Sequence, residues 1–137
     1  NAFLSEDEKS AFMHGPTYMA NPLAAAAANA SIDLFEDGTA LERVALIEAQ
    51  LKEQLEPCRE IAGVEDVRVK GAIGVIQMTE PRNINWLRQR FIEENVWIRP
   101  FGDIVYLMPP FIINTDELTA LTGAVVTVMN EWSKKTG

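Results

Sequence analysis

The chain has 137 residues, which is enough for one domain with a hydrophobic core and too few to suggest two. Apolar residues make up 47% and charged residues 23%, as in ordinary globular proteins, and no apolar run approaches the roughly 18 residues of a membrane span. The formal net charge of -8 argues against nucleic acid as a partner, because phosphate backbones are bound by clustered Lys and Arg. Composition thus excludes membrane-spanning and nucleic-acid-binding classes.

The chain contains one cysteine, Cys58, and one histidine, His14. A single cysteine cannot form an intrachain disulfide, and no export signal pattern is visible, so the cytoplasm is the expected location. A lone thiol of this kind is expected to be structural rather than a nucleophile. One histidine and one cysteine do not supply the three or four N/S ligands of a zinc site, so no metal is predicted.

The first recognisable element is a stiff turn followed by an alanine-rich helix, in the stretch 11-AFMHGPTYMANPLAAAAANASIDLFE-36. Asn21 and Pro22 predict the start of this helix, because Asn accepts hydrogen bonds from free N–H groups and Pro has no N–H to leave unpaired. The five alanines over 24–28 would give this helix small side chains on every face. They indicate either close approach of a neighbouring backbone or simply the helix propensity of alanine.

A second helix is predicted from about Thr39 to Leu55, between Asp37-Gly38 and Pro57. Its expected apolar face consists of Leu41, Val44, Leu51 and Leu55. The two helices together would form a helical arm.

Strands and helices follow in the rest of the chain. Residues 67–70 alternate between apolar and polar as a strand does, Gly71 marks a bend or bulge, and residues 72–78 are expected to be a buried strand. A helix is predicted over 83–95, and its apolar side consists of Ile84, Leu87, Phe91 and Ile92. Two strands over 96–98 and 104–108 are predicted to form a hairpin. The last predicted helix is capped by Asn114, and its apolar stripe consists of Leu118, Leu121, Val125, Val128 and Trp132. This order predicts an α+β fold with a small, mainly antiparallel sheet covered on one face by helices. The three tryptophans and the methionines have core-like spacing and are interpreted as packing residues.

Two features are candidates for binding chemistry. In His14-Gly15-Pro16-Thr17, glycine lets a ligand approach the backbone, proline fixes the turn, and the threonine hydroxyl can donate to an anionic oxygen. Spacing alone leaves open whether this turn is a phosphate clamp or a loop connector, and whether the histidine is a general base or a hydrogen-bonded structural residue.

The second candidate is Arg99, which lies among Trp97, Ile98 and Phe101. Such a guanidinium either meets a carboxylate through its bidentate fork, or turns toward solvent by the alternation of a strand end. Tyr106 in the next predicted strand either faces the same cavity or packs in the sheet. The residues alone therefore support a binding half-site without a nucleophile or a base.

The stretches FMHGPTYMANPLAAAAANAS, VRVKGAIGVIQM and VWIRPFGDIVYLMPPFII give the chain a family resemblance. In order and spacing it resembles the C-terminal part of the adenosylmethionine-8-amino-7-oxononanoate aminotransferases (7,8-diaminopelargonic acid synthases). These are class III, fold-type-I pyridoxal-phosphate enzymes that transfer an amino group from S-adenosylmethionine to 8-amino-7-oxononanoate in biotin biosynthesis. Ornithine, acetylornithine and 4-aminobutyrate aminotransferases share the general pattern, and HGPT together with WIRPFG and YLMPP favours the biotin enzyme. The alternatives are another class III aminotransferase or a non-catalytic α+β ligand-binding or dimerisation module.

The resemblance also implies roles for particular residues. Pro16 and Thr17 would bind the phosphate of pyridoxal 5'-phosphate, with Thr17 reaching into the neighbouring subunit's site of a homodimer. Gly15 would lie against the substrate, and Arg99 would hold the substrate carboxylate. Tyr106 would line the same pocket.

The resemblance further implies that the chain is a fragment of a longer enzyme. In the family the Schiff-base lysine lies about thirty residues before the turn, whereas only fourteen residues precede Gly15. We therefore expect no catalytic residue in this chain and no transamination by the chain alone. The expected segments are 1-21, the end of a large-domain loop; 22-56, a connecting helical arm; and 57-137, the small C-terminal α+β domain of a fold-type-I transferase.

Overall fold

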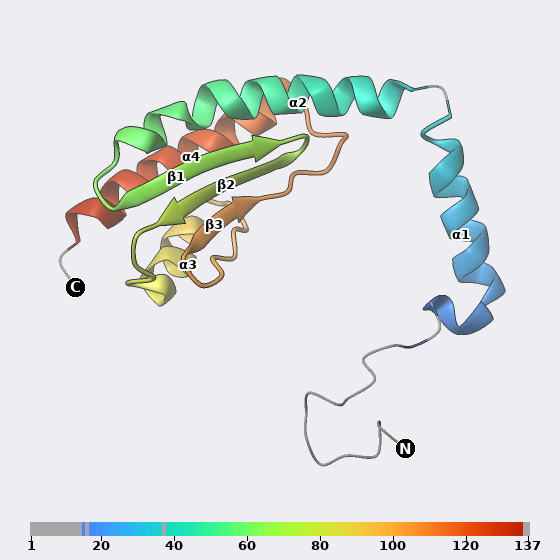
Figure 1. The fold of residues 1–137 in the computed structure, drawn as a ribbon, viewed down its shortest axis with the longest axis horizontal. Coiled ribbons are helices and arrows are strands. Elements are labelled where there is room, and N and C mark those ends of the chain that lie inside the picture. The colour runs from blue at the N-terminus through green and yellow to red at the C-terminus, as the bar shows by residue number, and fades with distance from the viewer. Residues whose placement is uncertain (1–14, 16, 37, 136–137) are drawn as a thin grey trace, which may run out of the picture. The chain divides into compact units, whose positions relative to one another are not determined.

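The computed structural model describes residue 15 and residues 17–36 and 38–135, in two units, Asn1–Asp37 and Gly38–Gly137. The first unit contains the short 3-10 helix η3 (Thr17–Ala20) and the helix α1 (Pro22–Asp33) (Figure 1). The Oδ1 atom of Asn21 accepts hydrogen bonds from the N–H groups of Leu23 (3.0 Å) and Ala24 (3.5 Å). The predicted start of this helix is thus confirmed, and no residue of α1 is buried.

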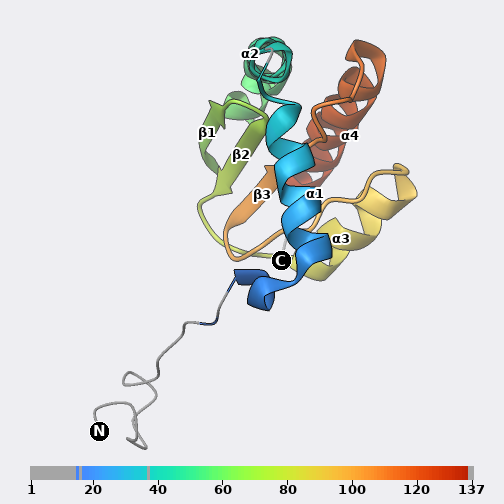
Figure 2. The ribbon, with the colours of Figure 1, turned by 90° about the vertical axis from the view of Figure 1, so that its right-hand side faces the viewer.

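The second unit is an α+β layer. Its elements are α2 (Thr39–Leu55), η4 (Glu56–Glu60), β1 (Val64–Lys70), β2 (Ile73–Met78), α3 (Ile84–Glu93), β3 (Ile104–Leu107) and α4 (Thr115–Lys134). The strands form an antiparallel sheet in the order β1-β2-β3. Figure 2 shows α2 and α4 over the same face of this sheet, with α3 next to α4. The predicted fold class is confirmed.

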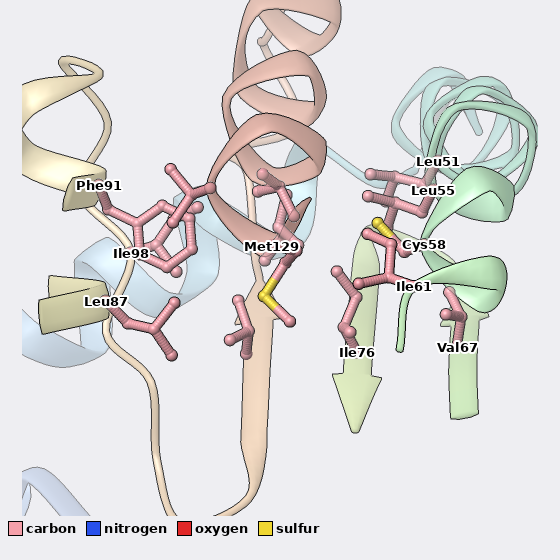
Figure 3. Close-up of a cluster of buried hydrophobic side chains, with 14 of the residues drawn as sticks. Leu51, Leu55, Cys58, Ile61, Val67, Ile76, Leu87, Phe91, Ile98 and Met129 are labelled. Atoms are coloured by element: carbon pink, nitrogen blue, oxygen red, sulfur yellow. The ribbon is translucent and has the colours of Figure 1, made fainter. Parts of the chain in front are cut away.

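The hydrophobic core lies between the sheet and the helices. Val67, Ile76 and Val105 are paired neighbours on three adjacent strands, and all three are buried. Leu55 of α2 and Met129 of α4 cover them (Figure 3). The inward-facing residues of the strands, which alternate, and those of the helices, which recur about every 3.6 residues, therefore form one apolar layer.

The turn between β1 and β2 is held by α2. Gly71 has a φ of 56°, in the left-handed region that favours glycine, so it forms a tight hairpin turn after Lys70 rather than a bulge. Its N–H donates to the carboxylate of Glu48 at 2.7 Å. This bond ties the hairpin to the middle of α2.

A capping box begins α4, as predicted. The side chain of Asn114 accepts from the N–H of Glu117 (2.9 Å), and the Glu117 carboxylate accepts from the N–H of Asn114 (3.0 Å). Two free N–H groups of the first turn are thereby satisfied.

The predicted strand over 96–98 is wrong. The N–H of Val96 donates to the carbonyl of Phe91 (3.0 Å) and closes the end of α3. Phe101 and Ile104 exchange two backbone bonds around Gly102, which has a φ of 57°, so the pairing before β3 is limited to this isolated bridge. A tight turn leaves residues 96–98 outside the hydrogen-bonded ladder.

Several apolar side chains predicted to pack are exposed instead. Trp132 is fully buried, but Trp97 is 83% exposed. The other exposed side chains among those predictions, within the described residues, are Met19, Leu41, Ile92 and Met108, and Met13 lies outside the described residues. Helical or strand spacing alone overestimated the width of the covered face, because it cannot show where the neighbouring layer ends.

Candidate functional site

Arg99 lies beside a cavity of about 270 Å³ at the β3 edge of the sheet. Tyr106 of β3 and the two prolines of the loop between β3 and α4 help to line it; the lining includes Trp97, Arg99, Tyr106, Pro109, Pro110 and Leu121. Ile98 is buried, whereas Trp97 and Arg99 on either side of it are exposed. The predicted neighbourhood of Arg99 and Tyr106 is thus present in the fold.

The guanidinium of Arg99 forms no ion pair or hydrogen bond with any residue that the structure describes. Arg90 differs, because its side chain contacts the carboxylates of Glu131 (2.8 Å), Glu94 (2.5 Å) and Glu93 (3.2 Å). Those contacts, led by the hydrogen bond to Glu131, raise the pKa of Arg90 and tie α3 to α4. Arg90 is thus structural, whereas Arg99 is a cation that an external anion can reach.

A second arginine near Arg99 was missed by the sequence analysis. Arg88 of α3 lines a cavity of about 300 Å³ together with Trp97, Ile98 and Arg99. Its Nη2 donates to the carbonyl of Pro100 at 3.5 Å, and its Nη1 donates to the Oδ1 of Asn85 at 3.2 Å. Nothing in the local sequence distinguishes this arginine from a solvated helix residue.

The predicted phosphate-binding turn belongs to the first unit. Gly15 is exposed, and a Cβ added to it would meet nothing within 4 Å, so a ligand can approach its backbone. The backbone of Thr17 begins η3. His14 and Pro16 lie outside the described residues. A backbone N–H can donate to a phosphate oxygen, and the stretch 15–36 contains no lysine.

The two halves of the predicted site lie in different units. Gly15 and Thr17 belong to the first unit, and Arg99 and Tyr106 belong to the second, so each half is described by itself. The second unit therefore provides a cation beside an apolar cavity, which is suited to binding a carboxylate.

Cys58 lies in the core, where it is fully buried. Burial raises the pKa of its thiol to about 11, because the thiolate would lose its hydration. The prediction of a structural cysteine is therefore confirmed.

No three His, Cys, Asp or Glu side chains of residues 15, 17–36 and 38–135 gather where they could hold a metal ion. None of the helices in the same ranges combines the length and apolar character needed to cross a bilayer.

Solved structures with a similar fold include transaminases. The adenosylmethionine-8-amino-7-oxononanoate aminotransferase of Methanocaldococcus jannaschii matches with a TM-score of 0.74 and 26% identity, over 90% of this chain and 31% of that chain. An (S)-enantioselective omega-transaminase of Thermomicrobium roseum matches with a TM-score of 0.74 and 24% identity, over 88% of this chain and 29% of that chain, which is a likeness of fold alone. The chain thus has the fold of one segment of these transaminases.

Sequence comparison specifies the family within this class. The profile described as Aminotransferase class-III matches residues 1–129, and the chain therefore belongs to the class III aminotransferases. It is 47% identical over 119 residues to the adenosylmethionine-8-amino-7-oxononanoate aminotransferase of Corynebacterium glutamicum, covering 84% of this chain and 28% of the relative. It is 37% identical over 128 residues to the Saccharomyces cerevisiae protein of the same name, covering 88% and 27%. The chain spans less than a third of the length of these relatives.

Proposed function

We propose that the chain is the C-terminal segment of a pyridoxal-phosphate-dependent aminotransferase of biotin biosynthesis. The reaction transfers an amino group from S-adenosylmethionine to 8-amino-7-oxononanoate and gives 7,8-diaminononanoate. The observation that carries this proposal is the identity of 37–47% to relatives from bacteria and yeast that bear the name of this enzyme, over most of the chain. The enzyme is proposed to work in the cytoplasm.

The proposed site has two parts. Pro16 and Thr17 bind the cofactor phosphate, and Thr17 acts across the interface of a homodimer in the neighbouring subunit's site. Gly15 lies against the substrate. When bound, pyridoxal phosphate supplies an electron sink for the substrate carbon that exchanges the amino group. Segment 1-21 would carry the turn, 22-56 the connecting arm, and 57-137 the small domain.

Arg99 is the proposed carboxylate-binding residue. Both S-adenosylmethionine and 8-amino-7-oxononanoate carry a carboxylate, so one guanidinium fork can orient the donor and then the acceptor. Support comes from the exposure of Arg99, its lack of a described carboxylate partner, and the apolar cavity beside it. An apolar surround strengthens the attraction between the guanidinium and the substrate anion.

The amino donor is tested with the full-length enzyme that contains this chain. We expect amino transfer from S-adenosylmethionine to exceed transfer from ornithine or 4-aminobutyrate. A clear preference for either of the latter two would contradict the proposed reaction. The 137-residue chain with added cofactor is expected to show no turnover, and measurable turnover would contradict our interpretation that the catalytic lysine lies elsewhere in the protein.

The role of Arg99 is tested with Arg99→Met in the full-length enzyme. Losing a charge-assisted contact of about 2 kcal/mol should raise the KM for S-adenosylmethionine by about 30-fold. The kcat/KM for decarboxylated S-adenosylmethionine, which reports on the half-reaction of the donor alone, should be about equal in the variant and the parent enzyme. Arg68→Met is the matched control, because Arg68 is an exposed arginine that bonds to Asp66 and Gln77. If Arg99→Met still prefers the carboxylated donor as strongly as the parent does, the proposed role is wrong.

A further inference from the structure

The loop over 108–113, between β3 and α4, forms one wall of the cavity beside Arg99. Met108, Pro109, Pro110 and Ile113 contribute to this wall. The N–H of Ile113 donates to the carbonyl of Pro110 at 3.0 Å, and the two prolines have no N–H to donate. Such a loop depends on contacts from other elements to keep one conformation.

Arg43 of α2 provides such contacts. Its Nε donates to the carbonyl of Phe111 at 2.5 Å, and its Nη2 donates to the carbonyls of Ile112 at 3.1 Å and Ile113 at 3.0 Å. Figure 1 shows the loop (orange) running from β3 to the beginning of α2, where these bonds are made. One planar fork thus holds three successive carbonyl groups and fixes the path of the loop backbone.

Arg43 forms no ion pair with a carboxylate of the described residues. It also does not line the cavity beside Arg99, so its effect on that cavity passes through the loop. The three bonds join segments that are 68 to 70 residues apart in the sequence.

We propose that Arg43 is a positioning residue for substrate binding. It holds the loop over 108–113 in the path that shapes one wall of the cavity lined by Arg99, and this wall sets how the substrate carboxylate meets the guanidinium. The proposal rests on the proposed role of Arg99. Loss of Arg43 should therefore weaken the binding of carboxylated substrates more than it slows the chemical step.

A control for general stability is available on the same helix. The Nε2 of Gln50 donates to the Thr115 carbonyl at 2.9 Å and to the Thr119 Oγ1 at 3.0 Å. Gln50→Leu thus removes bonds between α2 and α4 without removing a bond to the loop over 108–113. Arg43→Lys keeps the positive charge but loses the planar guanidinium. Its defect should therefore be smaller than that of Arg43→Met.

The experiment uses the full-length enzyme and two measurements. Amide hydrogen exchange followed by mass spectrometry reports on the peptide that contains Ile113, and steady-state kinetics separate KM for S-adenosylmethionine from kcat. For Arg43→Met we expect faster exchange in that peptide and a KM raised about fivefold to tenfold, as for the loss of one or two hydrogen bonds, with kcat within about twofold. Arg43→Lys should lie between this variant and the parent. Gln50→Leu should leave both the exchange of the peptide and KM unchanged.

Three results would overturn the positioning role. These are unchanged exchange in Arg43→Met, faster exchange with an unchanged KM, and an equal rise of KM in Gln50→Leu. Failure of the proposed function would be seen elsewhere, as an unchanged preference for the carboxylated donor in Arg99→Met. That failure would not alter the exchange measurement, which reports on the loop itself.

Discussion

The helix α2 packs closely on Gly74 of β2, and Gly74→Ala tests this packing. An added Cβ would lie 2.8 Å from the Cδ1 of Leu55 and 3.8 Å from the nearest side-chain atoms of Leu51 and Leu107. Carbon atoms in contact are normally about 3.5–4.0 Å apart, so Leu55 must move by about 1 Å. Leu55 is fully buried, so this movement disturbs the side chains around it. Overpacking of this kind costs about 1–3 kcal/mol.

The entropy of the unfolded chain offsets part of this cost. Replacing glycine by alanine stabilises a compatible site by about 0.4–1 kcal/mol, so the net destabilisation expected for Gly74→Ala is about 0–2.6 kcal/mol. Gly123 in α4 is the matched control, because a Cβ added there would meet nothing within 4 Å. Gly123→Ala should therefore stabilise the chain by about 0.5–1 kcal/mol.

Urea unfolding of the 137-residue chain measures both variants, and a double-mutant cycle tests the cause. Leu55→Ala alone should cost about 2–5 kcal/mol, because it leaves a cavity. In the double variant the methyl group introduced by Gly74→Ala would occupy part of that cavity, so the combined loss should be smaller than the sum by about 1 kcal/mol. The packing argument is refuted if Gly74→Ala stabilises as Gly123→Ala does, or if the two losses add.

Two further predictions concern titratable groups. A hydrogen bond from Arg90 lowers the pKa of Glu131, and hydrogen bonds from Lys52 and Arg68 lower those of Glu48 and Asp66. Each carboxylate therefore contributes stability above its ordinary pKa, and this contribution is lost as the pH falls through the lowered value. The free energy of unfolding should decline below about pH 4.5, and the decline should be smaller in Arg90→Met; urea titrations at several pH values measure this, and an equal decline in the variant would contradict it. The thiol of Cys58, whose pKa is raised by burial to about 11, should react slowly with a thiol reagent in the folded chain at about pH 9 and rapidly in urea; fast labelling of the folded chain would show that the thiol is accessible.

The helices could be predicted because their boundaries are encoded locally. Asn21 followed by Pro22 predicted the start of α1, and Asn114 with Glu117 three residues later predicted the start of α4. A cap satisfies N–H groups within one helical turn, so all the residues that it needs are adjacent in the sequence. The extent of α2 was predicted for the same reason, since Gly38 precedes it and Pro57 follows it.

The error over 96–98 has a nonlocal cause. Val96 and Ile98 have the residue types of a strand, but a strand exists only where a second backbone offers hydrogen-bonding groups in register. Pairing before β3 is limited to the Phe101–Ile104 bridge, and Trp97 is exposed. Neither fact can be read from the pattern of the segment itself.

For the candidate site, the sequence by itself determined which residue types are present: an arginine among apolar residues, and a Gly-Pro-Thr turn that resembles a cofactor site. Only the tertiary structure decided that Arg99 is exposed beside an apolar cavity, and that Arg43 holds the loop that forms a wall of this cavity. Capping acts over three or four residues, whereas the contact between Arg43 and Phe111 spans 68, a separation at which spacing along the chain carries no information about proximity.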